Sequence, residues 1–542
     1  GLGFSRSQAP DNHMEAVETP FSLGLSLKER EAELASQRER LLPQLKRQLV
    51  GTFRYPMIQA EAYQPYLVRN DYDLAMNKLL FRSLFSYDID GAITADLVTA
   101  LSFSTDQRIV EISLRDDAFF ADRSLISATD VKAAIDYLIS DNDFSSERYS
   151  QGYYNPDLAA IESCEVIDPY GLRIFLNKAD PFIAHALTFP ILKYDQVELR
   201  GIDKFTLSKP FHEPKRSESG NLLFELIDKT ENQGLAHIGS YEIISYANEG
   251  DLTKAFEKDE IDMIFAFTGQ LQWAEKRHFV YKLDRGVALR NLNVNADNLA
   301  DVRTLREAFS TLYQNRRIFR PIDPALSTQG YPVSQKAISS LIFPESANYR
   351  VRRKPGTKLP EIQRTELKLI YPNTLLFADE IAEAIKQYAE PLACKIKIES
   401  MNEDEFYQAL QYPNVDLALL PINFHRSPDP RAFFSASNGD AFWRDNHINP
   451  VLEADFLDKN LASDQIDLFK DYTLANGIYS PMEDPAFVEL YLSCIQNLSD
   501  MPLAGYTTAV YLQDRVRGKL SSNSLNPLEG IENLWIENDR ES

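Results

Sequence analysis

Cysteine and histidine are scarce in this chain of 542 residues, which has three cysteines and seven histidines. Cys164, Cys394 and Cys494 are widely separated, so they permit at most one disulfide and form no cluster of metal ligands. We expect them to be small buried hydrophobic residues. The histidines form no HxH or HxxxH pair, which argues against a preformed zinc site. The sequence therefore predicts no metal centre and no cofactor.

The chain also has few basic residues relative to acidic ones, and it has no long apolar run. Lys and Arg number 57 against 80 Asp and Glu, a formal net charge of −23. Because phosphate binding needs a positive field, this balance argues against nucleic acid as a partner. No run approaches the roughly 18 apolar residues of a membrane-spanning helix. The start, GLGFSRSQAPDNHMEAVETP, lacks the basic end and apolar stretch of a signal peptide, which leaves the compartment open because a leader is removed on maturation.

Catalytic motifs are absent as well. The sequence holds no GxSxG, P-loop, HExxH or GxGxxG pattern. Paired carboxylates, such as Asp116 with Asp117 and Asp259 with Asp262, occur in polar stretches, and we expect them to face solvent. With neither a nucleophile nor a metal constellation in view, a hydrolase is disfavoured and the chain is not expected to be an enzyme.

The chain nevertheless has the composition of a large folded protein, with 44% hydrophobic and 11% aromatic residues. Its length predicts more than one lobe. The most informative stretch runs from Leu84 to Val131. It contains a turn at Asp88–Gly91, strand-like alternation at Ile109–Leu114, and a helix start at Ser127 that continues through Ile139. This order predicts short strands followed by a capped helix.

The same stretch resembles the signature of extracytoplasmic solute-binding proteins of the oligopeptide, dipeptide and nickel ABC importers, known as family 5. Arg123 replaces the family's glycine, so the chain looks like a divergent member. The resemblance implies an α/β, two-lobed, periplasmic-binding-protein-like fold of type II, with a hinge, a cleft and an extra subdomain in the first lobe. Thirteen positions match in order: Leu84, Tyr87, Asp88, Gly91, Asp96, Leu97, Leu114, Arg115, Phe120, Asp122, Ala128, Asp130 and Val131.

Two further blocks extend the resemblance. Asn291–Ile318, with an amphipathic helix expected at Val302–Phe319, resembles the family's crossing into the second lobe. MPLAGYTTAVYLQDRVRGKL resembles the return crossing. Two family motifs are missing, and residues 200–238 are expected to be a polar loop instead. The implied domains are an N-terminal extension at 1–50, a first lobe at 51–288, a second lobe at 289–502 and a return to the first lobe at 503–542.

Other elements follow from hydrophobic patterning. Residues 366–420 alternate between strand and helix patterns, which predicts a mainly parallel sheet. Before the main body, Ser26–Val50 has a capping-box start and leucines every seven residues. It predicts a helix that docks on the surface of the body or on a partner protein. The remaining expected elements are a strand at Thr52–Ile58, a helix at Asp71–Phe85, a hairpin at Ile161–Leu176, strands at Glu366–Pro372, Lys395–Ser400 and Val415–Leu420, and helices at Ala378–Tyr388 and Asn402–Leu410.

The ligand site is expected between the lobes, beyond the carboxyl ends of strands. The loop at 421–434, PINFHRSPDPRAFF, stands where the resemblance implies an Asp that pairs with a peptide's α-ammonium group. His425 or Arg426 occupies that position, depending on the alignment. We therefore hypothesise that the protein does not grip free peptide N-termini in the usual way. An anionic ligand, or a zwitterionic one in reversed orientation, would suit Arg426. The alternative is that Arg426 is a surface residue and the cleft is degenerate.

Position alone suggests the other ligand contacts, on the segment after the first strand and around the 421–434 loop. The implied function is a periplasmic or membrane-anchored solute receptor that closes on its ligand and delivers it to an ABC importer permease. The alternative is a non-transporting sensor, regulatory or partner-binding protein with the same fold; the first 50 residues are too short, and not basic enough, for a DNA-binding module. The candidate ligand-binding residues are Glu61, Ala62, Tyr63, Asn423, Phe424, His425, Arg426 and Trp443.

Overall fold

The computed structural model describes residues 51–87, 93–140, 153–154, 158, 160–177, 180, 183–227, 238–291, 326–327, 366–392, 394–410, 415–423 and 500–537. The helices expected at Ser26–Val50 and Val302–Phe319, and Cys494, lie outside these residues. In this part of the chain, no helix is long and apolar enough to cross a membrane.

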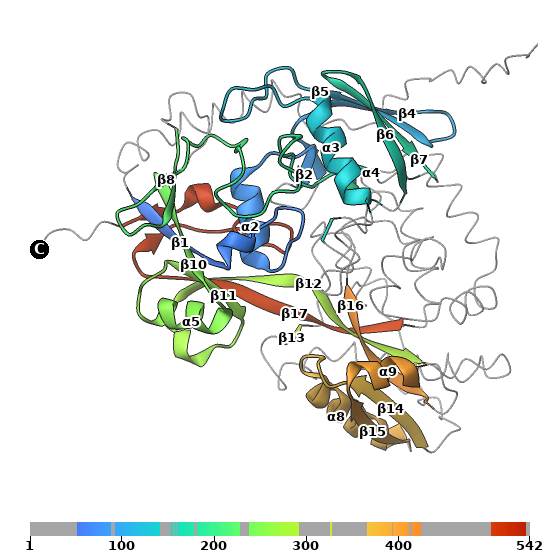
Figure 1. Ribbon diagram of the computed structural model, residues 1–542. Helices are drawn as coiled ribbons and strands as arrows, with labels where there is room; N and C mark the ends of the chain where they lie inside the picture. The colour runs from blue at the N-terminus through green and yellow to red at the C-terminus, as the bar shows by residue number, and fades with distance from the viewer. Residues whose placement is uncertain are drawn as a thin grey trace, which may run out of the picture.

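The first sheet of the first lobe has the order β1-β10-β9-β8 (Figure 1). β1 forms where predicted and pairs in parallel with β10. β8 and β9 correct the expectation of a polar loop at 200–238. They form because Leu222 and Phe224 alternate into the core, where Phe224 lies opposite Tyr241 and beside Phe211. The bounds are β1 Thr52–Ile58, β8 Lys215–Arg216, β9 Leu222–Glu225 and β10 Ser240–Tyr246.

A second, antiparallel sheet of the first lobe has the order β4-β5-β7-β6, with helix α3 contacting β6 and β7 (Figure 1). The strand at Ile109–Leu114 and the hairpin at Ile161–Leu176 are confirmed, as is the capped helix. The Asp130 carboxylate accepts a hydrogen bond of 2.8 Å from the Ser127 backbone N–H, which completes the helix start. The bounds are β4 Val98–Phe103, β5 Ile109–Leu114, α3 Ala128–Ile139, β6 Ile161–Asp168, β7 Gly171–Leu176 and α4 Ile183–Ala186.

Helix α2 is shorter than predicted. It spans Asp71–Leu80 instead of continuing to Phe85, because Phe81 adopts an extended backbone and the chain then enters strand β2. Burial of Leu84 and Phe85 made the apolar pattern look continuous. β2, at Phe85–Tyr87, pairs with β3, at Ile93–Ala95.

Asp96, just after β3, forms hydrogen bonds with the segment between α2 and β2. Its carboxylate accepts from Arg82 Nη2 at 2.6 Å and from the Ser83 backbone N–H at 3.3 Å. Burial alone would raise the pKa of Asp96, but Arg82 and Lys209 outweigh it and lower the pKa below its usual value. A carboxyl with a lowered folded-state pKa stabilises the fold above the unfolded-state value of about 3.9, and that stability is lost as the pH falls through the folded-state pKa.

We therefore expect Asp96→Asn to lower the free energy of unfolding at pH 7 by about 1–2 kcal/mol. The difference from the wild type should shrink as the pH falls below about 4, where the wild-type carboxylate also becomes protonated. Urea unfolding of both proteins at pH 7 and pH 3 measures this. A difference that stays the same at both pH values would show that the charge of Asp96 is not what stabilises this segment.

A sheet that runs from the first lobe into the second combines parallel and antiparallel strands. Its order is β11-β17-β12-β16-β14-β15, with β13 beside β17. β14 pairs in parallel with both β15 and β16, which confirms the parallel arrangement predicted for 366–420. β16 corrects one detail: it continues through Asn423 because β12 offers backbone partners as far as Arg285, so the loop expected from Pro421 starts later. The bounds are β14 Glu366–Pro372, α8 Ala378–Ala389, β15 Lys395–Met401, α9 Glu403–Ala409 and β16 Leu417–Asn423.

Two long antiparallel strands, β12 and β17, connect the lobes. They run side by side from the first lobe to the α/β unit of β14, β15 and α8 (Figure 1). The predicted domain limits at 288/289 and 502/503 fall inside these strands and stay a prediction. The remaining bounds are α5 Glu249–Glu257, β11 Met263–Phe267, β12 Arg277–Asn291, β13 Leu326–Ser327, β17 Asp500–Leu512, β18 Val516–Arg517 and β19 Trp535–Ile536, with short 3₁₀ turns η1 Ala60–Ala62, η3 Leu271–Trp273, η5 Glu390–Leu392 and η7 Ile531–Asn533.

The expectation of buried cysteines is confirmed for the two that are described. Cys164, on β6, and Cys394, just before β15, are both buried. Burial raises the pKa of the Cys164 thiol to about 12, so the thiol stays protonated at neutral pH. Both residues act as small hydrophobic side chains of the core.

Candidate functional site

The carboxyl ends of strands from both lobes point at the middle of the β12–β17 pair. β16 runs antiparallel to β12, from Leu417 opposite Asn291 to Asn423 opposite Arg285, and β14 runs parallel to β16. From the other side, β11 ends at Phe267 opposite Thr508 of β17. Ligands of open α/β sheets bind beyond carboxyl ends of strands, so this convergence marks the candidate site.

The segment after β1 reaches the same side of the first lobe. Arg54 contacts Asp262, just before β11, and Tyr55 donates to the Tyr72 carbonyl at 2.7 Å. The Tyr72 hydroxyl in turn accepts from the Phe265 backbone N–H at 2.9 Å. β1 and β11 therefore advance in the same direction, and the turn η1 follows β1 on the side where β11 ends.

The three candidates on this segment have different environments. Glu61 is exposed and lies 3.4 Å from the Ser245 hydroxyl, while Ala62 is half-buried. Tyr63 is completely buried: its hydroxyl donates to Asn77 at 2.6 Å and its ring packs edge-on against Phe205. Glu61 and Ala62 are therefore open to a ligand in this arrangement, and the Tyr63 ring belongs to the core.

Of the candidate ligand-binding residues in the second lobe, the structure describes Asn423 and no other. Asn423 is the last residue of β16, so its backbone stands at the converging strand ends. Phe424, His425, Arg426 and Trp443 lie outside the described residues. The proposed roles of these four residues rest on the sequence alone.

An aromatic cluster at the middle of the β12–β17 pair was not anticipated. Phe267 ends β11, Tyr506 lies on β17 and Phe377 precedes α8, and the three ring centroids are 5.9–6.0 Å apart. The Tyr506 hydroxyl also donates to the Leu376 carbonyl at 3.0 Å. The residues come from three distant segments, so no local pattern in the sequence could have grouped them.

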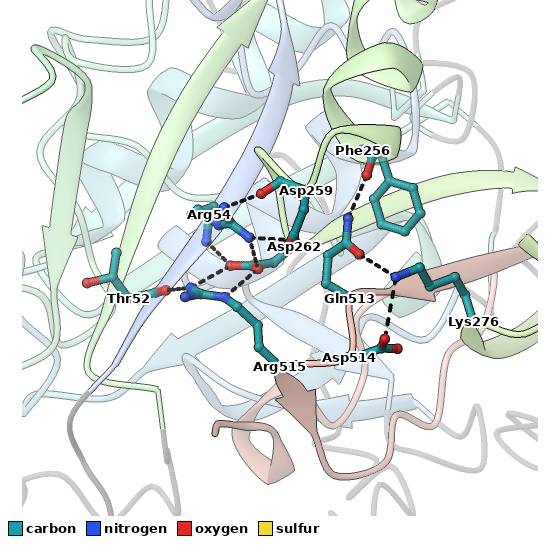
Figure 2. Close-up of polar contacts among 9 residues, drawn as sticks. All are labelled: Thr52, Arg54, Phe256, Asp259, Asp262, Lys276, Gln513, Asp514 and Arg515. Atoms are coloured by element: carbon teal, nitrogen blue, oxygen red, sulfur yellow. Dashed lines mark hydrogen bonds and ion pairs between the residues drawn. The ribbon is translucent and has the colours of Figure 1, made fainter. Parts of the chain in front are cut away.

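Asp262 corrects the prediction that the Asp259 and Asp262 carboxylates face solvent. Asp259 is 69% exposed, but the Asp262 side chain is completely buried between two arginines (Figure 2). Arg54 reaches it through the backbone N–H at 2.7 Å and through Nη2 at 2.8 Å. Arg515 donates from Nε at 2.7 Å and from Nη2 at 3.0 Å. Four hydrogen bonds thus satisfy both oxygens of the buried carboxylate.

The Asp262 network fastens the end of the β12–β17 pair to the first lobe. Arg515, just after β17, also donates to the Thr52 carbonyl of β1 at 2.5 Å (Figure 2). Burial alone would lower the pKa of Arg54, but hydrogen bonds and charge attraction from Asp262 and Asp259 outweigh it and raise the pKa. Arg54 therefore keeps its charge, and the returning chain is held by the Arg515–Asp262 ion pair and by the Arg515 hydrogen bond to the Thr52 carbonyl.

The end of β17 is held by a second set of contacts beside the first (Figure 2). Gln513 donates to the Phe256 carbonyl at 2.7 Å and accepts from Lys276 Nζ at 2.8 Å, just before β12. Lys276 also lies 3.7 Å from Asp514. Both long strands are thus anchored at the first lobe. Among the described residues, no group of three or more His, Cys, Asp or Glu side chains could hold a metal ion.

The fold is shared with solved protein structures, among them an oligopeptide-binding protein. HbpA2 from Haemophilus parasuis superposes with a TM-score of 0.62 at 14% identity, covering 90% of this chain and 100% of that protein. AppA from Bacillus subtilis, in complex with a nonapeptide, gives 0.52 at 14% identity, covering 90% and 98%. NikA from Brucella suis, in complex with Fe(III)-EDTA, gives 0.56 at 18% identity, covering 90% and 99%. These similarities show a common two-lobed fold.

The sequence also matches a family model. No curated protein sequence is significantly similar to this chain. Residues 92–444, however, match the model described as "Bacterial extracellular solute-binding proteins, family 5 Middle". That match covers more than half of the chain and confirms the resemblance found in the Leu84–Val131 signature. This chain belongs to the family 5 bacterial extracellular solute-binding proteins.

Proposed function

We propose that this protein captures a peptide-like or other small polar ligand by hinge closure and delivers it to the permease of an ABC importer. The convergence of strand ends from both lobes on the β12–β17 pair carries the proposal. A ligand bound there is contacted from two sides only when the lobes close, so binding favours the closed state. The family's extracellular character supports a periplasmic or membrane-anchored location outside the cytoplasm.

The ligand we favour carries a negative charge toward the second lobe. Arg426, or His425, replaces the carboxylate that the family resemblance implies in that loop, and a buried arginine facing an ammonium group would be repulsive. On the first lobe, Glu61 exposes a carboxylate beside Ser245. A zwitterionic ligand with its carboxylate at Arg426 and its ammonium group near Glu61 satisfies both charges. Ala62, Asn423, Phe424 and Trp443 are the proposed surrounding contacts.

Ligand-induced stabilisation tests the proposal. Thermal-shift measurements would compare di- to pentapeptides with their N-acetylated forms and with anionic analogues. A ligand at 100 times its Kd stabilises the folded state by about 2.7 kcal/mol. We expect anionic and N-acetylated compounds to stabilise the protein at least as strongly as unmodified peptides, because the second lobe offers a cation in place of a carboxylate. Strong stabilisation by unmodified peptides only would contradict the role of Arg426.

Substitutions then test whether Arg426 contacts the ligand or is a surface residue. Arg426→Ala should abolish most of the stabilisation by the best compound, and Glu61→Ala should reduce stabilisation by zwitterions more than by anions. Arg108→Ala is the matched control, because Arg108 is an exposed arginine in the turn just before β5 of the first lobe. If no compound stabilises the protein, a peptide-like ligand is contradicted; if Arg426→Ala behaves like Arg108→Ala, Arg426 is a surface residue.

A further inference from the structure

The pairing of β12 with β17 shifts register at two places, between Lys282 and Gly286 and between Val287 and Ala288, and the first interruption is the wider. Arg277–Lys282 pair regularly with Leu512–Thr507, and pairing resumes at Gly286 opposite Gly505. The chain advances by four residues on β12 but by only two on β17, so β12 carries a bulge. Bulges bend a strand locally, and glycine is found where a strand bends sharply. The long pair is therefore built to bend at Gly286 and Gly505.

Different lobes hold the strand pair on the two sides of this bulge. Before it, Phe267 and the other residues of β11 pair with the Thr508–Leu512 part of β17. After it, β16 pairs with the Arg285–Asn291 part of β12. The bulge is thus the point at which the pair leaves the first lobe and enters the second, which is where a hinge has to be.

Tyr506 stands next to this point and contacts both lobes. Its ring centroid is 6.0 Å from Phe267 at the end of β11 and 6.0 Å from Phe377, which precedes α8 in the second lobe. Phe267 and Phe377 lie 5.9 Å from each other, and the Tyr506 hydroxyl donates to the Leu376 carbonyl at 3.0 Å. Aromatic packing and one hydrogen bond therefore join the two lobes across the bulge.

The backbone at Phe377 supports a role in this junction. Phe377 has a φ of 60°, in the left-handed region that bulky side chains rarely adopt. Such a conformation persists only where its surroundings enforce it. The ring contacts with Phe267 and Tyr506 provide that enforcement, because they hold the Phe377 ring at the first lobe while α8 begins in the second.

We propose that Phe267, Phe377 and Tyr506 form a latch across a hinge at Gly286 and Gly505, and that the latch stabilises the closed arrangement of the lobes. Closure brings the carboxyl ends of β11 and β14 toward each other, and the latch joins Phe267, at the end of β11, to Phe377, which follows β14. The inference deepens the proposed function, since the closed-state population sets the apparent ligand affinity.

The distance between the lobes tests the latch without any ligand. Spin labels at Glu257→Cys on α5 and Glu383→Cys on α8, in a Cys494→Ser background, report the two lobes, because both positions are exposed and Cys164 and Cys394 are buried. Pulsed electron paramagnetic resonance gives the share of molecules at the distance found in this structure. Tyr506→Phe removes the hydroxyl that donates to the Leu376 carbonyl, so the ratio of closed to open molecules should fall about three- to tenfold.

Two further variants make the outcome decisive. Phe377→Gly removes the ring and tolerates the left-handed backbone, and it should open the lobes at least as much as Tyr506→Phe. Tyr511→Phe is the matched control: Tyr511 lies on the same strand but packs on Trp273 and His278 of the first lobe. A latch is overturned if Tyr506→Phe leaves the distances unchanged, or if Tyr511→Phe shifts them equally. Because no ligand is added, failure of this test is distinct from failure of ligand binding.

Discussion

Replacing Asp262 with alanine is expected to lower the free energy of unfolding by about 3–5 kcal/mol, the range found when one partner of a buried ion pair is removed. The Asp262 carboxylate is completely buried and accepts from both Arg54 and Arg515. Its loss leaves the partly buried Arg515 guanidinium without its buried anion and leaves Arg54 paired with the exposed Asp259. Because Arg515 also holds the Thr52 carbonyl, the chain that returns after β17 would lose its attachment to β1.

Asp259→Ala is the matched control for Asp262→Ala. Asp259 also bonds to Arg54, at 3.1 Å, but its side chain is 69% exposed. Exposed ion pairs contribute about 0–1 kcal/mol, so this variant should unfold at nearly the wild-type urea concentration. Equal and small effects of the two substitutions would show that the Asp262 network does not fasten the returning strand. Urea unfolding followed by tryptophan fluorescence and circular dichroism measures both variants.

Gly518→Ala is expected to destabilise the fold by about 3 kcal/mol. Gly518 has a φ of +103°, a backbone conformation that L side chains rarely adopt. A Cβ there would overlap the Asn533 carbonyl oxygen and lie 3.0 Å from the Leu534 Cα, both on rigid backbone. The Gly518 carbonyl also accepts from Arg277 Nη1 at 2.7 Å, at the start of β12. A displaced Gly518 therefore disturbs the anchored end of the long strand pair.

Gly220→Ala separates backbone strain from this overlap. Gly220 has a φ of +81°, and a Cβ there would meet nothing within 4 Å. Its substitution should cost about 1–2 kcal/mol, the penalty of a left-handed conformation alone. Thermal unfolding should therefore rank the wild type first, Gly220→Ala second and Gly518→Ala last. A reversed order of the two variants would contradict the close backbone approach at Gly518.

The sequence predicted the fold where the stabilising contacts join residues that are close together in the chain. In the Leu84–Val131 signature, Asp130 accepts from the backbone N–H of Ser127, and Asp122 accepts from that of Ser124. Asp96 holds Arg82 in the same way. These acidic residues fix turns and helix ends within a short stretch of chain, so their spacing can be recognised in a single sequence. The alternating pattern of 366–420 is equally local, and its parallel strands were predicted for that reason.

Contacts between segments that are far apart in the chain could not be predicted from the sequence. Asp262 looks like one more acid in a polar stretch, because its partners Arg54 and Arg515 are 208 and 253 residues away. The aromatic cluster of Phe267, Phe377 and Tyr506 could not be predicted for the same reason. Position after a strand suggested Glu61 and Tyr63 together, yet only the structure separates an exposed carboxylate from a core tyrosine. Packing of this kind depends on the whole fold.

Small-angle X-ray scattering with and without the most stabilising compound of the thermal-shift panel tests the central claim most directly. A protein that binds a solute by closing two lobes about β12 and β17 becomes more compact when it is saturated. We therefore predict that the radius of gyration decreases on addition of the compound, and that Arg426→Ala prevents the decrease at the same compound concentration. An unchanged radius of gyration at saturating compound would contradict capture by hinge closure.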